Sequence, residues 1–105
     1  MIPHAQIRSA LRKIWLWSPV RREALKRAKV GGVAKTWRCE WCKLWTNEPE
    51  VDHILPVGST PGARGADAAA TWDDLIRRMF CSAEGLRVLC RYCHQAKTKQ
   101  KGEAS

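Results

Sequence analysis

Hydrophobic and polar residues alternate in the N-terminal third at intervals typical of two amphipathic helices. Residues 5–17 place apolar side chains at helical spacing, with arginines and a lysine between them. Ser18 and Pro19 then predict a new helix start, because Ser suits the N-cap and Pro suits the first helical position. The second helix would run to about Lys29, where two glycines follow. We expect a basic helical hairpin within residues 1–34.

Beyond residue 34 the pattern predicts short strands, a loop and two more helices. We expect short strands on both sides of a Cys-x-x-Cys turn in TWRCEWCKLWT, then strands in EVDHILPV and LRVL, with the loop GSTPGARGADAAA between these two. Thr71 is a suitable cap for a helix from Trp72 to about Phe80. A last helix would run from His94 to about Lys101. The predicted class is α+β.

Chain length limits the size of the hydrophobic core. The 105 residues suffice for one compact domain, in which a metal ion or disulfides would help a modest core. We divide it into a basic extension (1–34), a core (35–101) and a tail (102–105). No apolar stretch approaches the ~20 residues of a membrane span, and the start lacks a secretory signal. We therefore expect a cytoplasmic protein without a membrane partner, whose paired cysteines stay reduced.

Positive charge is concentrated in the first third of the chain. Residues 1–38 contain ten Lys and Arg and one acidic residue, a balance of +9, whereas residues 39–105 contain nine of each sign. Such segregation indicates contact with a polyanion. The alternative is a solvated helix face that keeps the protein soluble, although solubility does not require segregation.

Four of the five cysteines form two Cys-x-x-Cys pairs. Cys39 and Cys42 are separated from Cys90 and Cys93 by 47 residues. Each pair can bind one edge of a tetrahedral zinc ion at about 2.3 Å per sulfur, and four thiolates leave no open position. We expect a structural zinc site that contributes to folding; the alternative is reduced core cysteines at chance spacing. Cys81 is expected to be a packed thiol.

Asp52, His53 and His94 are candidates for phosphodiester chemistry. Hydrolysis of a phosphodiester needs a base to activate water and a cation to neutralise developing charge. Asp52 and His53 could supply a metal ligand and the base, although the dipeptide alone equally fits a structural or surface histidine. His94 directly follows the second cysteine pair, so a zinc-held helix could bring it to the same ion as Asp52. The alternative is a spare zinc ligand.

The segments CEWC, VDHILPV and LRVLCRYCHQAKT, in this order, resemble the zinc-containing branch of the HNH endonuclease (ββα-metal) family. The likeness covers residues 39–98 and is specific in the combination of DHIxP with LCxxCHxxKT. The helix WDDLIRRMFC and the basic N-terminal part are more loosely similar to small HNH proteins of tailed bacteriophages. The resemblance implies a zinc-stapled ββα-metal core.

The resemblance also implies a metal-dependent endonuclease that nicks or cuts DNA with low sequence specificity, in phage genome processing. His53 matches the general base, and Asp52 and His94 match the ligands of a catalytic Mg²⁺, Mn²⁺ or other divalent ion. The four paired cysteines match the structural zinc ligands. The implied partners are DNA and phage packaging or replication proteins, in the host cytoplasm if the chain is phage-encoded.

One position departs from the family pattern. Gly85 stands where the family usually has an Asn that braces the loop carrying the base. We expect the backbone to supply that brace here; the alternative is weak or absent activity. The departure keeps a second hypothesis open, a non-catalytic zinc-stabilised module that binds nucleic acid. A third is a phage protein that binds and inhibits a host protein.

Basic side chains are predicted to contact DNA phosphates. Such contacts position the duplex without reading its sequence, so affinity should fall steeply with salt. The predicted residues are Arg8, Arg12, Lys13, Arg21, Arg22, Lys26, Arg27, Lys97 and Lys99. The six tryptophans are expected to pack in the core and around the cysteines rather than to stack on single-stranded bases.

Overall fold

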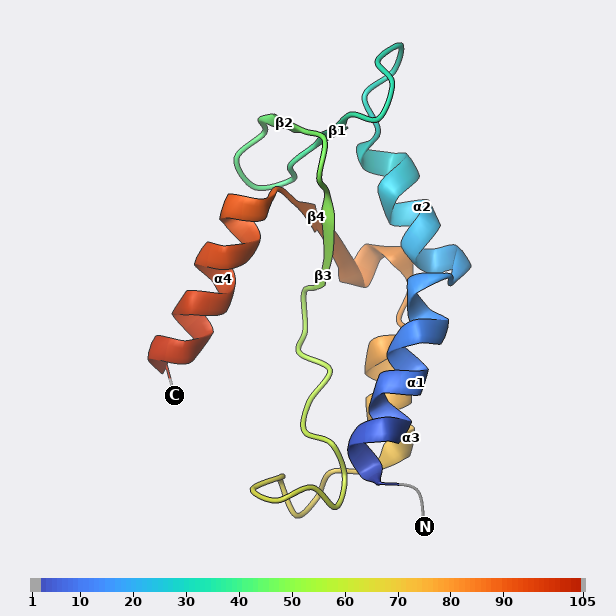
Figure 1. Ribbon diagram of the computed structural model, residues 1–105, viewed down its shortest axis with the longest axis vertical. Coiled ribbons are helices and arrows are strands. Elements are labelled where there is room, and N and C mark those ends of the chain that lie inside the picture. The colour runs from blue at the N-terminus through green and yellow to red at the C-terminus, as the bar shows by residue number, and fades with distance from the viewer. Residues whose placement is uncertain (1–2, 105) are drawn as a thin grey trace.

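The computed structural model describes the backbone of residues 3–104 and the side chains of residues 3–99. Residues 1–2 and 105, at the ends of the predicted extension and tail, lie outside the described residues. The described chain is α+β, as predicted, with four α-helices and two small antiparallel sheets (Figure 1). In chain order the elements are α1 (His4–Leu16), α2 (Pro19–Ala28), β1 (Trp37–Arg38), β2 (Trp45–Thr46), β3 (Glu50–His53), α3 (Trp72–Met79), the 3-10 turn η1 (Ala83–Gly85), β4 (Leu86–Leu89) and α4 (Arg91–Ala104).

The strands β3 and β4 form the sheet at the centre of the molecule. They are antiparallel, with Glu50 opposite Leu89 and His53 opposite Leu86. The helix α4 lies on one side of this sheet, and α2 packs against it from the other side (Figure 1). Successive side chains of a strand point to opposite faces. Val51 accordingly packs against the hydrophobic core, while its neighbour Asp52 contacts α4.

The N-terminal helices share one hydrophobic core with the rest of the chain. Residues from α1, α2, α3, η1 and β4 meet in a single buried cluster, which consists of Trp15, Ala24, Ala28, Leu75, Met79, Ala83, Leu86 and Val88. The small Ala24 and Ala28 lie one helical turn apart, so α2 presents a narrow face on which the sheet can pack closely. The basic N-terminal region is therefore part of the core and not an appendage to it.

The predicted hairpin of the two N-terminal helices is wrong in its packing. The helix α2 follows α1 nearly end to end, with only Trp17 and Ser18 between them (Figure 1). The physical reason is that the two apolar faces find different partners. The helix α1 packs against α3, whereas α2 packs against β3 and β4. A hairpin would bury these faces against each other and leave the sheet uncovered.

Helix ends follow the sequence signals in part. The Thr71 hydroxyl accepts a hydrogen bond from the Asp74 backbone N–H at 3.2 Å, which confirms the predicted cap of α3. Ser18 is the N-cap residue of α2 as predicted, but its side chain makes no cap hydrogen bond. The helix α4 continues to Ala104, past the predicted end near Lys101, since the helix contains no Pro and most of its residues other than Gly102 are helix formers. No helix within residues 3–104 is both long and apolar enough to cross a membrane.

Glu40 connects the turn between β1 and β2 to the central sheet. Its carboxylate accepts hydrogen bonds from the Val88 backbone N–H at 2.6 Å and from the Arg27 guanidinium at 2.7 Å and 3.1 Å. Burial alone would raise the pKa of this carboxyl, but the bonds from Arg27 and Val88 outweigh it and hold the pKa below its ordinary value. One side chain thus joins three elements of the fold.

Replacing Glu40 by Ala should lower the free energy of unfolding by about 1–3 kcal/mol, because a half-buried backbone N–H and the Arg27 guanidinium lose their acceptor. Urea denaturation followed by circular dichroism measures this change. Glu48→Ala is the matched control, since Glu48 is exposed and its carboxylate has no partner among the described side chains. Equal stability of the two variants would contradict this role of Glu40.

Candidate metal centre and adjoining pocket

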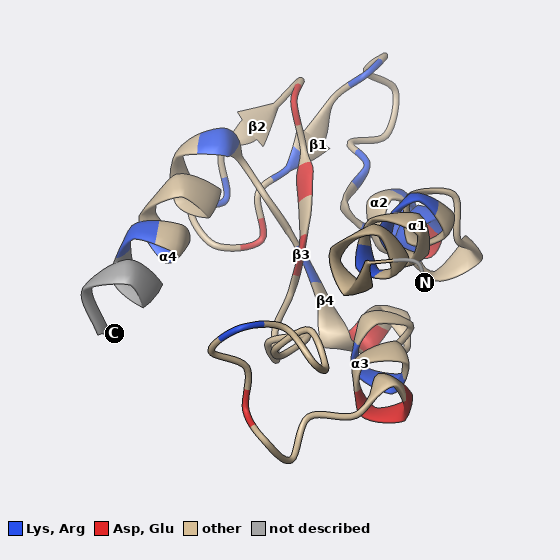
Figure 2. Cartoon of the chain, turned by 60° about the horizontal axis from the view of Figure 1, so that its bottom comes forward, with Lys and Arg blue, Asp and Glu red and all other residues tan. Residues whose placement is uncertain are grey.

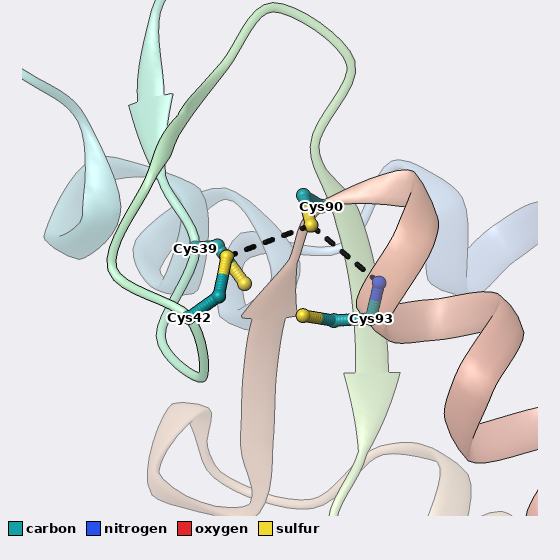
Figure 3. A group of neighbouring side chains, drawn as sticks. All are labelled: Cys39, Cys42, Cys90 and Cys93. Carbon is teal, nitrogen blue, oxygen red and sulfur yellow. Dashed lines mark hydrogen bonds between the residues drawn. The ribbon is translucent and has the colours of Figure 1, made fainter.

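The two Cys-x-x-Cys pairs come together in one cluster. Cys39 and Cys42 come from the turn between β1 and β2, Cys90 follows β4, and Cys93 lies in the first turn of α4 (Figure 3). The four sulfur atoms all lie within 4.8 Å of one another. Within the described part of the chain, this is the one group of three or more His, Cys, Asp or Glu residues positioned to hold a metal ion.

The spacing of the sulfur atoms fits a tetrahedral ion. Two sulfurs bound to one zinc at about 2.3 Å each are about 3.8 Å apart, and Cys42 Sγ and Cys90 Sγ lie 3.8 Å apart. The chain also supplies the frame for the cluster. Lys43 adopts a positive φ of 68° and its N–H donates to the Cys39 carbonyl, so the turn folds back and brings both sulfurs to one side.

The cysteine thiols cannot all ionise while they face only each other. Burial and the neighbouring thiols raise the pKa of Cys93 to about 12. Burial also opposes ionisation of Cys39, but backbone hydrogen bonds, chiefly from Cys42 and Cys90, lower its pKa to about 6. A bound cation removes the conflict, because metal-coordinated thiols ionise together. The group could thus hold a structural metal such as zinc.

Cys81 stands apart from this cluster. It packs against the hydrophobic core, as predicted, and burial raises its pKa. Its side chain also lies against Gly85, where an added Cβ would be 2.8 Å from Cys81 Sγ. A larger residue at position 85 would need Cys81 to move. The Gly85 carbonyl accepts a hydrogen bond of 2.9 Å from the N–H of Ile54, directly after His53.

The three candidate catalytic residues line one pocket. Asp52 and His53 at the end of β3 and His94 in the first turns of α4 border a pocket of about 230 Å³. The other lining residues come from α1, β3, the loop after β3 and the end of α3, and they are Arg8, Arg12, Trp15, Val51, Val57 and Met79. Side chains predicted from two distant parts of the sequence, residues 52–53 and residue 94, are therefore neighbours in space.

The imidazole of His53 is held from two sides. Its Nε2 lies 2.8 Å from the carbonyl oxygen of Met79, and the Trp15 ring lies against it with the two ring centroids 4.8 Å apart. A carbonyl can only accept, so Nε2 carries the proton and donates. The neutral ring then has its lone pair on Nδ1. This arrangement leaves one proton-accepting nitrogen in a fixed orientation.

Asp52 forms an ion pair with Lys97 of α4. The ammonium binds Asp52 Oδ2 and also donates to the His53 carbonyl oxygen at 2.9 Å. The two side chains are only 15% and 16% exposed, so the pair is well shielded from solvent. Lys97 was predicted to contact DNA, but its ammonium faces the strand instead. Asp52 retains Oδ1, which Lys97 does not use.

His94 has a carboxylate neighbour that the sequence did not single out. Its Nδ1 lies 2.7 Å from Glu50 Oε2. Glu50 and Asp52 are two residues apart in β3 and therefore point to the same face, toward α4. With Nδ1 next to Glu50, the remaining nitrogen that could bind a ligand is Nε2. Glu50 Oε2 is buried and forms no hydrogen bond within the described residues, so its contact with His94 is one of proximity and charge.

The remaining basic residues of the predicted DNA set, outside the pocket, differ in what they contact. Figure 2 shows Lys and Arg gathered on α1 and α2 and acidic residues along β3. Arg27 is bonded to Glu40 and to the carbonyls of Ala83 and Leu86, a structural role. Arg21 and Arg22 lie near backbone carbonyls at the end of α1. The exposed lysines of the set are Lys13, Lys26 and Lys99.

The tryptophans are less buried than expected. Trp15 is 5% exposed, but Trp17 and Trp45 are 81% and 62% exposed. Trp17 follows α1 at the point where the chain turns into α2, and Trp45 belongs to a sheet of only two strands. The expectation of packing is therefore wrong for Trp17. Trp45 also lies outside the core, although it borders hollows lined by Cys39 and by Cys90.

Comparisons with protein-family models, with curated proteins and with solved structures found no match for this chain.

Proposed function

We propose that the protein is a metal-dependent DNA endonuclease of the HNH type, stapled by a structural zinc ion. The observation that carries the proposal is the common pocket of Asp52, His53 and His94, next to the four-cysteine cluster. A base, a carboxylate and a second imidazole around one small pocket are the groups that hydrolysis of a phosphodiester requires. The order of these residues along the chain is that of the resemblance to the HNH family.

In this proposal His53 is the general base. Nδ1 takes a proton from water as the water attacks phosphorus, and the Met79 carbonyl stabilises the imidazolium that forms by accepting from Nε2. The Trp15 ring prevents the imidazole from turning away. Fixed orientation matters because a general base must be within hydrogen-bond reach of the proton that it removes.

Asp52 and His94 are the proposed ligands of a divalent ion such as Mg²⁺ or Mn²⁺. Carboxylate and imidazole groups are types of ligand that divalent ions accept, and Asp52 Oδ1 and His94 Nε2 are the atoms not in contact with Lys97 and Glu50. When bound, the ion would neutralise charge on the phosphate and on the leaving oxygen. Glu50 would orient His94, and Lys97 would keep the Asp52 carboxylate in place.

The Gly85 backbone takes the role that the resemblance gives to an Asn side chain. Its carbonyl holds the N–H of Ile54, directly after the proposed base. Cys81 fills the space in which a side chain at position 85 would lie. In this proposal, the hydrogen bond from the Ile54 N–H to the Gly85 carbonyl holds the segment that carries His53, so the protein can be active without the Asn side chain.

Replacing His53 by Ala should reduce cleavage of DNA by about 10²–10⁴-fold, the contribution typical of a general base. The measurement is conversion of supercoiled plasmid to nicked and linear forms with Mg²⁺, Mn²⁺ or Ni²⁺. His4→Ala is the matched control, because His4 lies at the start of α1 and does not line the pocket. The control should cleave at the wild-type rate.

Duplex binding is measured alongside, by fluorescence anisotropy over a range of salt concentrations. We expect His53→Ala to bind as the wild type does, with an affinity that falls steeply with salt. Cleavage by His53→Ala at the wild-type rate would overturn the assignment of the base.

A non-catalytic nucleic-acid-binding module is the second candidate. The observation that favours it is the shielded ion pair of Lys97 with Asp52, which occupies one oxygen of the proposed metal ligand. Salt-sensitive binding of duplex DNA without cleavage in any of the three metals would support this candidate over the endonuclease.

A further inference from the structure

We propose that Arg12 binds the phosphate group that lies in the pocket of Asp52, His53 and His94. The inference depends on the proposed function for its ligand class, a phosphodiester. It separates Arg12 from the exposed Lys13 and Lys26, which would contact the DNA backbone elsewhere, and from Arg27, which is bonded to Glu40. The pocket is then incomplete without the N-terminal helix.

Two arginines from one face of α1 reach the pocket. Arg8 and Arg12 are four residues apart, so they lie one above the other on the helix surface. Both line the pocket of about 230 Å³ together with the three candidate catalytic residues. Both also line the adjoining hollow beside the loop after β3, with Asp52, His53 and Gly58. This face of α1 is thus directed at the proposed reaction centre.

The two arginines differ in what their guanidinium groups contact. Arg8 donates to the Gly58 carbonyl at 2.7 Å and to Thr60 Oγ1 at 3.1 Å, so it fastens the loop after β3 to α1. Arg12 is exposed and forms no hydrogen bond or ion pair with any side chain or backbone group of residues 3–99. Its donors are available to a ligand, whereas those of Arg8 are engaged.

The charge around the pocket favours an anion. Asp52 is the one carboxylate among the lining residues, and Lys97 already balances it. Arg8 and Arg12 then remain as a positive surplus. A planar guanidinium can donate two parallel hydrogen bonds to one phosphate, which makes arginine well suited to position that group.

The helix that carries Arg12 is fixed relative to the proposed base. Trp15 follows Arg12 by three residues, is buried in the core and lies against the His53 ring. Positions three apart share a helix face, so the contact that anchors α1 also directs Arg12 toward the pocket. Lys13, the next residue, is exposed and does not line the pocket.

The first test is binding of the dinucleotide phosphodiester TpT without divalent metal, followed by backbone amide NMR. We expect shifts at residues 52–53 and 12 in the wild-type protein and in Lys13→Ala. Arg12→Ala should lose about tenfold or more in affinity, as expected for a hydrogen bond to a charged group. Arg12→Lys keeps the charge but not the planar fork, and should fall between the two.

Unchanged TpT affinity in Arg12→Ala, or no shift at residues 52–53 in the wild type, would overturn the inference. Plasmid cleavage gives the second readout. Arg12→Ala should cleave at least about tenfold more slowly than Lys13→Ala, although each variant removes one positive charge. Pocket binding of TpT that depends on Arg12, without plasmid cleavage, would reject the nuclease proposal and leave the phosphate site intact.

Discussion

Cys42→Ser should leave the chain largely unfolded at neutral pH. Binding of a structural zinc ion contributes about 10–16 kcal/mol to small zinc domains, as much as or more than the ~5–15 kcal/mol of net stability of a typical domain. The Cys42 side chain is exposed, so the substitution removes no core packing. A loss of structure would therefore result from the loss of metal binding and not from a change in core packing. Circular dichroism and the metal content of the purified protein measure the outcome.

Cys81→Ser is the matched control for this experiment, because Cys81 lies outside the four-cysteine cluster. It should retain about one zinc per chain, and its circular dichroism should match that of the wild type. EDTA should unfold the wild type and Cys81→Ser alike. A folded, metal-free Cys42→Ser protein with wild-type stability would show that the cysteines do not form a structural metal site.

Trp15→Ala should cost about 3–5 kcal/mol of stability, the range for removing a large buried aromatic side chain. Trp15 fills the core between α1 and the sheet and also lies against His53. The same substitution should therefore slow plasmid cleavage, because the proposed base loses its neighbour. Urea denaturation of the metal-bound protein measures the change in the free energy of unfolding. Plasmid cleavage is compared at a temperature well below the unfolding midpoint of both proteins.

Trp17→Ala provides the control in the same helix region. Trp17 is 81% exposed, so its replacement should change stability by less than about 0.5 kcal/mol. Trp15→Phe keeps an aromatic ring next to His53 and should retain more activity than Trp15→Ala. Equal stability of Trp15→Ala and Trp17→Ala would mean that α1 does not anchor the fold.

The short-range features of the fold were predictable because each has a local physical cause. Thr71 caps α3 with its own hydroxyl, and the turn between β1 and β2 is set by the Cys-x-x-Cys spacing. The strand LRVL is buried almost throughout, as its apolar composition predicts. In each case the residues that decide the conformation are close together in the sequence.

The packing partners of the N-terminal helices were not predictable in this way. Helical spacing identifies an apolar face but not the element that covers it. Here α1 packs against α3 and α2 packs against the central sheet, so the two helices do not cover each other. The burial of Trp17 and Trp45 was likewise not predictable, and both side chains are exposed. Composition alone cannot tell whether a large apolar side chain has an element facing it.

The residues of the candidate site also include some that could be predicted from sequence and some that could not. Asp52, His53 and His94 were selected from sequence because their types and order suggest chemistry. Met79 was missed because its contribution is a backbone carbonyl, which has no sequence signal. Glu50 could have been found from strand alternation, since it shares the face of Asp52.

The two cysteine pairs are 47 residues apart, and this separation has a consequence for synthesis of the chain. While the ribosome is still making the segment before Cys90, the basic segment and the first cysteine pair have already been made, but Cys90, Cys93 and His94 have not. The strand β4, which covers α2, is also made late. Final assembly thus depends on contacts between residues distant in sequence, which slow folding. A nascent chain near nucleic acid therefore has its basic segment before it has the pocket to which His94 contributes.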